Sequence, residues 1–282
     1  DDPVMVRAES LAIAVDAASV FSGAPRVTGI TLVAPEVLLE TGAEGEANWL
    51  FAAAASPPAE GGQGGAAPSF SIDSARITDG RLTYRDGASG QSYVLSDLEL
   101  KTAIATLSEP VAVELSGTLG GAQLTASLAV ESPAGIMEGG SSGLGVDLTL
   151  GTAQVGFSGA YAPEAGTLIA GDLTASLPST SSTLAALGQP GVELPQGLGQ
   201  SVGVLAAISL TGAQLDATGL TLTLDKNVLS GSAVLDLGRD TPYLTAALTA
   251  GDLDLSALGG ADDGGAGADS APAPGAGWST EP

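Results

Sequence analysis

Histidine and cysteine are both absent from this chain of 282 residues. Without them the chain lacks the commonest metal ligands, the usual general base near neutral pH, thiol nucleophiles and disulfide bonds. No serine has a histidine to activate it, which excludes a Ser–His–Asp triad. The sequence therefore predicts a protein that is not an enzyme and that has no cofactor and no metal site.

Basic side chains are also scarce. Eight Lys and Arg stand against 32 Asp and Glu, which gives a net charge of −24. Proteins neutralise nucleic-acid phosphates with clustered Lys and Arg, so nucleic acid is not an expected partner. Electrostatic adhesion to an anionic membrane surface is disfavoured for the same reason. Arg76, Arg81 and Arg85 are close in sequence and have the chemistry to grip a carboxylate or phosphate, although such a set in an acidic protein more often solubilises an edge.

Long hydrophobic runs are missing as well. No window approaches the roughly 18 to 20 apolar residues of a membrane span, and the chain opens at Asp1 without a signal-like segment. We therefore expect a soluble piece of a longer protein. The hydrophobic content of 44% is that of a folded chain, but aromatics make up only 4% and 41 residues are Gly. These small side chains favour thin, repetitive β-layers over a thick core.

The most prominent pattern in the sequence is the alternation of apolar and polar residues. In residues 1–56 it predicts strands around 11–15, 30–32 and 37–39. Asn48 is a suitable N-cap for a short helix over 49–55, which Pro57 and Pro58 would end. Residues 57–68 are rich in Pro and Gly and are expected to be a linker.

Residues 69–259 are predicted to be a repetitive antiparallel β domain. Three hairpins are expected, with turns at Gly120–Gly121, at Gly151–Thr152 and at Lys226–Asn227. A short helix is expected over 183–187, followed by a loop over 189–200, a further strand over 244–248, and a Gly/Ala/Asp/Pro linker over 260–282. The returning strands share an apolar residue followed by Ser-Gly, a weak sign of repetition: Leu115-Ser116-Gly117, Phe157-Ser158-Gly159 and Leu229-Ser230-Gly231.

The fold expected from this pattern is all-β with one or two short helices, in an elongated, curled antiparallel sheet. One face is apolar and the other carries Thr, Ser and Asp. The apolar face then either packs as a sandwich-like core or lines a groove, and the acidic charge keeps the sheet soluble and discourages edge pairing. The candidate groove-lining residues are Leu124, Leu128, Leu144, Val146, Leu148, Val155, Phe157, Leu220, Leu222, Leu224, Leu244 and Leu248.

Two other patterns have a chemical interpretation. Paired carboxylates suit acid–base work, and the chain offers Asp252 with Asp254 and Asp97 with Glu99. Each pair alternates with leucines, which places the acids on the solvated face of a strand. Residues 264–269 match the start of a calcium-binding nonapeptide repeat, but one copy followed by Pro272 and Pro274 is more typical of a linker.

Residues 70–100, FSIDSARITDGRLTYRDGASGQSYVLSDLEL, resemble the AsmA-like proteins of Gram-negative bacteria. The likeness lies in an I-x-x-G-x-L-x-Y-x-D turn followed by an L-x-x-L-x-L strand. Residues 33–49 are similar to the family's early P-x-I-x-L … G-x-x-N-W segment, residues 220–258 resemble its recurrent closing strands, and Gly277-Trp278-Ser279 resembles the start of a further part. These motifs are structural and cover most of the chain.

The resemblance implies a periplasmic module, anchored to the inner membrane through a helix that this chain lacks. It also implies a part in outer-membrane biogenesis, with phospholipid acyl chains held or conducted along a hydrophobic β groove. An alternative is a structural or scaffolding domain that contacts outer-membrane assembly proteins through its edge strands. A calcium-stabilised adhesin ranks third and an enzyme last.

Overall fold

A computed structural model describes residues 4–21, 26–43, 45–49, 73–104, 106–163, 166–192, 194, 197, 199–239 and 241–254. Both expected linkers lie outside these residues, as do the calcium-repeat match and all but Trp49 of the helix expected over 49–55. Trp49 itself is in a turn, and the Asn48 side chain accepts a hydrogen bond from the Glu40 N–H at 3.0 Å.

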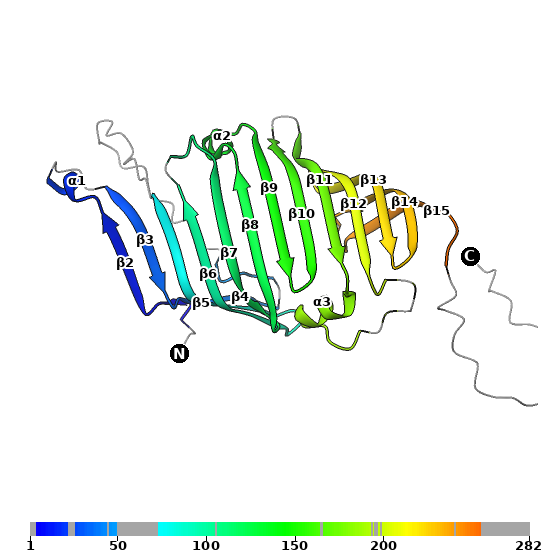
Figure 1. Ribbon diagram of the computed structural model, residues 1–282, viewed down its shortest axis with the longest axis horizontal. Coiled ribbons are helices and arrows are strands. Elements are labelled where there is room, and N and C mark those ends of the chain that lie inside the picture. The colour runs from blue at the N-terminus through cyan, green and yellow to red at the C-terminus, as the bar shows by residue number, and fades with distance from the viewer. Residues whose placement is uncertain are drawn as a thin grey trace, which may run out of the picture.

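The strands of the described residues form one mixed sheet that is open and curled rather than closed into a barrel (Figure 1). This confirms the expected all-β class. Each strand from β5 to β15 pairs antiparallel with the next along the chain. The strands are β1 (Val6–Arg7), β2 (Ser10–Val15), β3 (Val27–Val33), β4 (Glu36–Thr41), β5 (Ser74–Asp86), β6 (Ser92–Ala103), β7 (Val111–Leu119), β8 (Ala122–Val130), β9 (Ser142–Leu150), β10 (Ala153–Ala162), β11 (Thr167–Leu177), β12 (Val202–Thr211), β13 (Gln214–Leu224), β14 (Asn227–Asp236) and β15 (Tyr243–Ala250).

The first strands depart from a purely antiparallel order. β5 is 13 residues long, and both β3 and β4 pair with it in parallel, one along each half. β2 pairs with β3 and β1 with β4, so the strands of the two expected blocks belong to one sheet. Within the described ranges, three short helices accompany the sheet: α1 (Ala17–Phe21), α2 (Pro133–Met137) and α3 (Thr180–Ala186).

Local signals placed most turns correctly. Gly120 and Gly121, with φ of 56° and 82°, form the two-residue turn between β7 and β8, because only a primed turn matches the twist of the strands. The third hairpin turns one residue earlier than expected, at Asp225–Lys226, and Asn227 already pairs with Leu224. α3 also begins earlier than the expected range of 183–187, because Ser179 is its N-cap.

A first line of irregular backbone bends the sheet near its N-terminal end. Ala34, Asp79 and Asp97 all have φ near +50°, and the pairing register shifts at Asp79 and Asp97. The N–H of Ala34 donates to the Thr78 carbonyl at 2.8 Å, which places it beside the bulge in β5. Bulges of this kind turn a strand without moving its apolar residues to the other face. We call the part beyond this line, β1, β4, residues 81–86 of β5 and residues 92–96 of β6, the corner.

A second line of bends curls the C-terminal half, where β13 to β15 turn behind the sheet in Figure 1. Gly159 and Gly171 face each other, and a side chain on Gly171 would lie 2.5 Å from the Gly159 Cα. Gly231 similarly approaches the Ala247 carbonyl too closely for any side chain. In the first line of bends, a side chain on Gly117 would lie 2.9 Å from the Ser96 carbonyl. The repeated Ser-Gly signature therefore marks where strands meet too closely for a side chain.

Little of the described chain is fully buried. Its buried apolar residues include Pro35, Leu98, Leu150, Ala153, Ala186 and Ala206. Ala186 belongs to α3, which packs on the β7–β8 turn, and Gly188 beyond α3 lies beside the Tyr93 ring in the corner. Apart from this end, the described residues provide no second layer over the apolar face. The sheet is thus an open layer rather than one half of a closed sandwich.

The edges of the sheet contradict one expectation. β2 and β15 form open edges, and neither contains a charged residue, a Gly or a Pro. Natural sheets usually protect such edges with charges or bulges. The acidic residues therefore solubilise the polar face, but these two edges remain uncharged. Exposed apolar residues reach the edges as well, with Leu11 58% and Leu244 64% exposed.

Candidate functional site

The apolar face is the most extensive candidate surface. The pairing register places all twelve candidate groove-lining residues on this one face. Phe157 pairs with Val146, which pairs with Leu128, and Leu222 lies between Val204 and Leu229. The row through Val155 continues from Leu148 on one side to Ala175 on the other. Bulges in β12 and β13 keep the face continuous as the sheet curls.

Side chains on this face are partly covered by one another rather than by a second layer. Of the twelve, Leu128, Leu244 and Leu248 are exposed by 39%, 64% and 38%, and the other nine are half-buried. The face is therefore accessible from β7 to β15. An accessible apolar area of this extent is uncommon on soluble monomers and is typical of a surface that binds something.

Phe157 has a specific place on this face. A methyl group added to Gly159 would lie 2.6 Å from the Phe157 Cζ atom, so the ring lies against the glycine pair of β10 and β11. An aromatic ring over a glycine covers exposed backbone in a sheet. The ring therefore lies flat against the sheet and does not project from the apolar face at this point.

Aromatic residues gather at the corner. Tyr84 and Tyr93 lie opposite each other on β5 and β6, with ring centroids 6.2 Å apart and planes at 19°. The Trp49 ring is 6.1 Å from that of Tyr84. In a chain with 4% aromatics, this cluster and Gly188 together limit the apolar face at one end.

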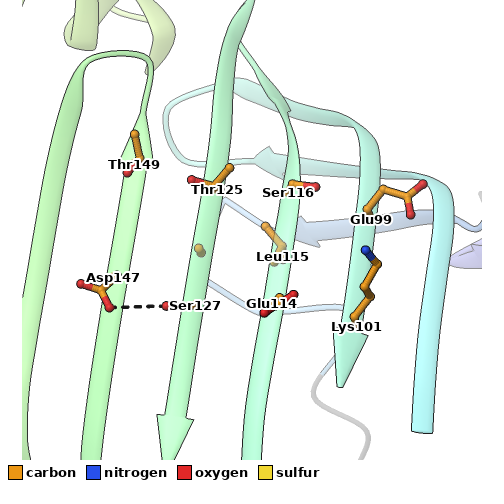
Figure 2. A pocket seen from close by; sticks show the side chains of 10 residues that line it. Glu99, Lys101, Glu114, Leu115, Ser116, Thr125, Ser127, Asp147 and Thr149 are labelled. Carbon is orange, nitrogen blue, oxygen red and sulfur yellow. Dashed lines mark hydrogen bonds between the residues drawn. The ribbon is translucent and has the colours of Figure 1, made fainter. Parts of the chain in front are cut away.

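The polar face has a hollow of about 330 Å³ over β6 to β9 (Figure 2). Lys101 lies in register between Arg76 and Glu114, and the Ser127 hydroxyl lies 3.5 Å from the Asp147 carboxylate. Among the described residues, hydroxyls, carboxylates and the Lys101 ammonium line it, together with Leu115 and Ala126. Within the described ranges, no set of three acidic side chains is arranged to hold a metal ion.

The two carboxylate pairs do not lie on regular strand faces, which corrects the expectation for them. Asp97 occupies a bulge, whereas Glu99 accepts a hydrogen bond from the Asp79 N–H at 3.2 Å. Asp252 is exposed, and the Asp254 backbone is bonded to the side chain of Asn227. Each acid therefore has a different environment from its pair member.

The three arginines of β5 separate into two groups. Arg76 lies before the bend, opposite Lys101. Arg81 and Arg85 lie in the corner, where they line a hollow of about 390 Å³ together with Arg7 of β1. Sequence reasoning missed Arg7, because it precedes Arg81 by 74 positions in the chain.

Asp225 and Asp86 have pKa values below the usual 3.8. The backbone N–H of Ser201, which donates to the Asp225 carboxylate at 2.7 Å, is the main cause for Asp225. The Ser89 hydroxyl, 2.6 Å away, is the main cause for Asp86. Both aspartates stabilise turns as anions, so neither is suited to transfer protons near neutral pH.

Comparison with protein-family models, curated proteins and solved structures found no match. Among the described residues, no helix has the length and apolar character needed to cross a bilayer.

Proposed function

We propose that this chain is a non-catalytic periplasmic module of the AsmA-like kind, which holds phospholipid acyl chains along its apolar face in the course of outer-membrane biogenesis. The supporting observation is the accessible apolar face that continues through β7 to β15 without a second layer among the described residues. The motifs in residues 33–49 and 70–100 support the AsmA-like part of the proposal.

The chemistry of the face suits an acyl chain. The side chains of Leu, Val and Ala present neither hydrogen-bond donors nor acceptors. The Phe157 ring lies flat over the glycine pair and does not project from the face. Each methylene buried against such a surface contributes about 0.8 kcal/mol. About ten buried methylenes then contribute roughly 8 kcal/mol before the entropy of ordering the chain is subtracted. A smooth face selects for chain length and not for a particular headgroup.

The absence of cysteine makes a direct test possible. Ala126 and Ser127 are neighbours on β8 that face opposite sides, Ala126 beside Leu148 and Ser127 beside Asp147. A polarity-sensitive fluorophore is attached to Ala126→Cys or, as the matched control, to Ser127→Cys. We expect added phospholipid to shift the emission to the blue at position 126 and to leave it unchanged at position 127.

Lipid retained during purification gives a second readout. We expect mass spectrometry to detect phospholipid in protein isolated from bacterial membranes. Leu148→Asp places a charge on the apolar face and should lower the lipid-to-protein ratio severalfold, whereas Thr149→Asp on the polar face should leave it unchanged. No retained lipid, together with no emission change at position 126, would refute the proposal.

A second candidate, a scaffolding domain for outer-membrane assembly proteins, is favoured by the uncharged open edges of β2 and β15. Such edges can add a strand from another protein. A photoreactive residue at Ala246 in β15 tests it, with the same residue at Thr221 inside the sheet as control. A protein crosslinked only at position 246, with no lipid retained, would support scaffolding over lipid binding.

A further inference from the structure

The hollow in the corner concentrates positive charge in an otherwise acidic protein. Among the described residues, Arg7, Arg81 and Arg85 line it together with one carboxylate, that of Glu36, and its volume is about 390 Å³. The hydroxyl of Thr83 also lines it, between the two arginines of β5. The lining therefore carries three guanidinium groups against one carboxylate.

Arg81 differs from the other two arginines of the hollow because it forms no ion pair with a described residue. Arg7 is 2.5 Å from Glu36, and Arg85 is 2.8 Å from Glu40. Glu36 lies opposite Arg81 in the β4–β5 register as well, but Arg81 forms no ion pair within the described part of the chain. The two ion-paired arginines remain accessible, with 72% of the Arg7 side chain and 55% of the Arg85 side chain exposed.

Geometry allows these side chains to meet on one ligand. Arg81, Thr83 and Arg85 alternate along β5 and so project from the same face, with about 7 Å between successive members. Guanidinium groups recognise phosphate and carboxylate oxygens through paired N–H donors. A tetrahedral phosphate presents oxygens in several directions and can engage more than one guanidinium, whereas the two oxygens of a carboxylate lie in one plane.

We propose that this hollow binds the phosphate group of a phosphate ester, with Arg81 as its principal ligand. Among the described residues, Val4 and Leu38 also line the hollow, and their aliphatic side chains suit the carbon part of such an ester. The site is on the polar side of β5, so the proposal is independent of acyl-chain binding on the apolar face.

The net charge of −24 does not prevent this binding. At physiological ionic strength, charges more than about 8 Å apart are largely screened. Strands are spaced about 4.8 Å apart, so acidic residues on β9 lie roughly 19 Å from β5. The nearer carboxylates of Glu36 and Glu40, on the neighbouring β4, are paired with Arg7 and Arg85, which leaves the charge of Arg81 for a ligand. Whole-surface adhesion to an anionic membrane remains unfavourable, but the local charge decides whether a single phosphate binds.

Arg81→Gln is the decisive variant, and Arg76→Gln is its matched control, because Arg76 is an exposed arginine of the same strand outside the hollow. Titration with inorganic phosphate and with glycerol 3-phosphate is followed by NMR, and binding to phosphatidylglycerol vesicles by flotation. Loss of one basic contact is worth about fivefold in affinity, from roughly 1 kcal/mol per basic residue near a lipid surface. We expect about this loss for Arg81→Gln, less for Arg81→Lys, and less than twofold for Arg76→Gln.

The two sources of phosphate give different results. Binding of vesicles but not of the small phosphates assigns the site to a lipid headgroup, and binding of both assigns it to phosphate esters in general. No binding of any probe, or equal losses for Arg81→Gln and Arg76→Gln, would overturn the proposal. Unchanged circular dichroism and urea midpoints of the variants establish that a loss reflects the site and not the fold.

Discussion

Replacing Asn227 tests how much its side-chain hydrogen bonds stabilise the C-terminal end of the sheet. Asn227 is 1% exposed, and its amide binds backbone on two other segments. It accepts from the Asp254 N–H at 2.6 Å, and it donates to the Asp254 carbonyl at 3.2 Å and to the Gly197 carbonyl at 2.8 Å. The side chain thereby holds the segment after β15 and the loop before β12 against the β13–β14 turn.

Asn227→Ala removes these three bonds. Each contributes about 1 kcal/mol, and a buried group left without its partner costs about 1 to 3 kcal/mol, so we expect a loss of roughly 3 kcal/mol in the free energy of unfolding. With a urea m-value of about 2 to 3 kcal/mol/M, the unfolding midpoint should fall by about 1 M. Urea titration followed by circular dichroism measures this shift, and hydrogen exchange should show lost protection in β14 and β15.

Asn48, the only other asparagine of the chain, is the matched control. Its amide makes the same kind of backbone contacts, accepting from the Glu40 N–H and donating to the Leu38 carbonyl, both at 3.0 Å. Asn48 is exposed, so water replaces the lost contacts and Asn48→Ala should cost less than about 1 kcal/mol. A midpoint shift below about 0.3 M for Asn227→Ala, or an equal shift for Asn48→Ala, would refute the burial argument.

Two further predictions concern the bends and the turns. Gly171→Ala should destabilise the protein by about 1 to 3 kcal/mol because its new methyl collides with the Gly159 backbone. The control is Gly145→Ala, whose new methyl would have its nearest neighbouring atom 3.7 Å away, and which should be neutral or slightly stabilising in urea titrations. Equal effects of the two substitutions would contradict the close-approach explanation. The pKa of Asp225 is lowered in the folded state, so its contribution to stability is present above about pH 4 and disappears as the pH falls through the lowered value. Asp225→Asn should therefore reduce the difference in urea midpoint between pH 6 and pH 3, and an unchanged difference would count against this role.

Regular strands and Gly-Gly turns were predictable because their causes are local. Alternation fixes which side chains share a face, and the β7–β8 turn depends on two adjacent glycines. The sequence also contains a local signal for α2. Ser132 caps this helix by accepting from the Gly135 N–H, and Pro133 follows at the first helical position.

The errors arose where distant residues decide the local structure. The third hairpin turns at Asp225 because its carboxylate accepts hydrogen bonds from the backbone of Gly199 and Ser201, more than 20 residues earlier. The parallel pairing of β3 and β4 with β5 likewise depends on segments that are separated in the sequence. No short-range pattern contains these partners.

By itself, the sequence determined that this protein is a β-sheet with one apolar and one polar face, because a period of two side chains is a property of each strand alone. It also marked the glycines of the bends, although not their purpose. Only the tertiary structure decided that the apolar face stays open, that β2 and β15 leave uncharged edges, and that Arg7 joins Arg81 and Arg85. These features depend on strand order and on the two lines of bends, which arise from contacts between neighbouring strands.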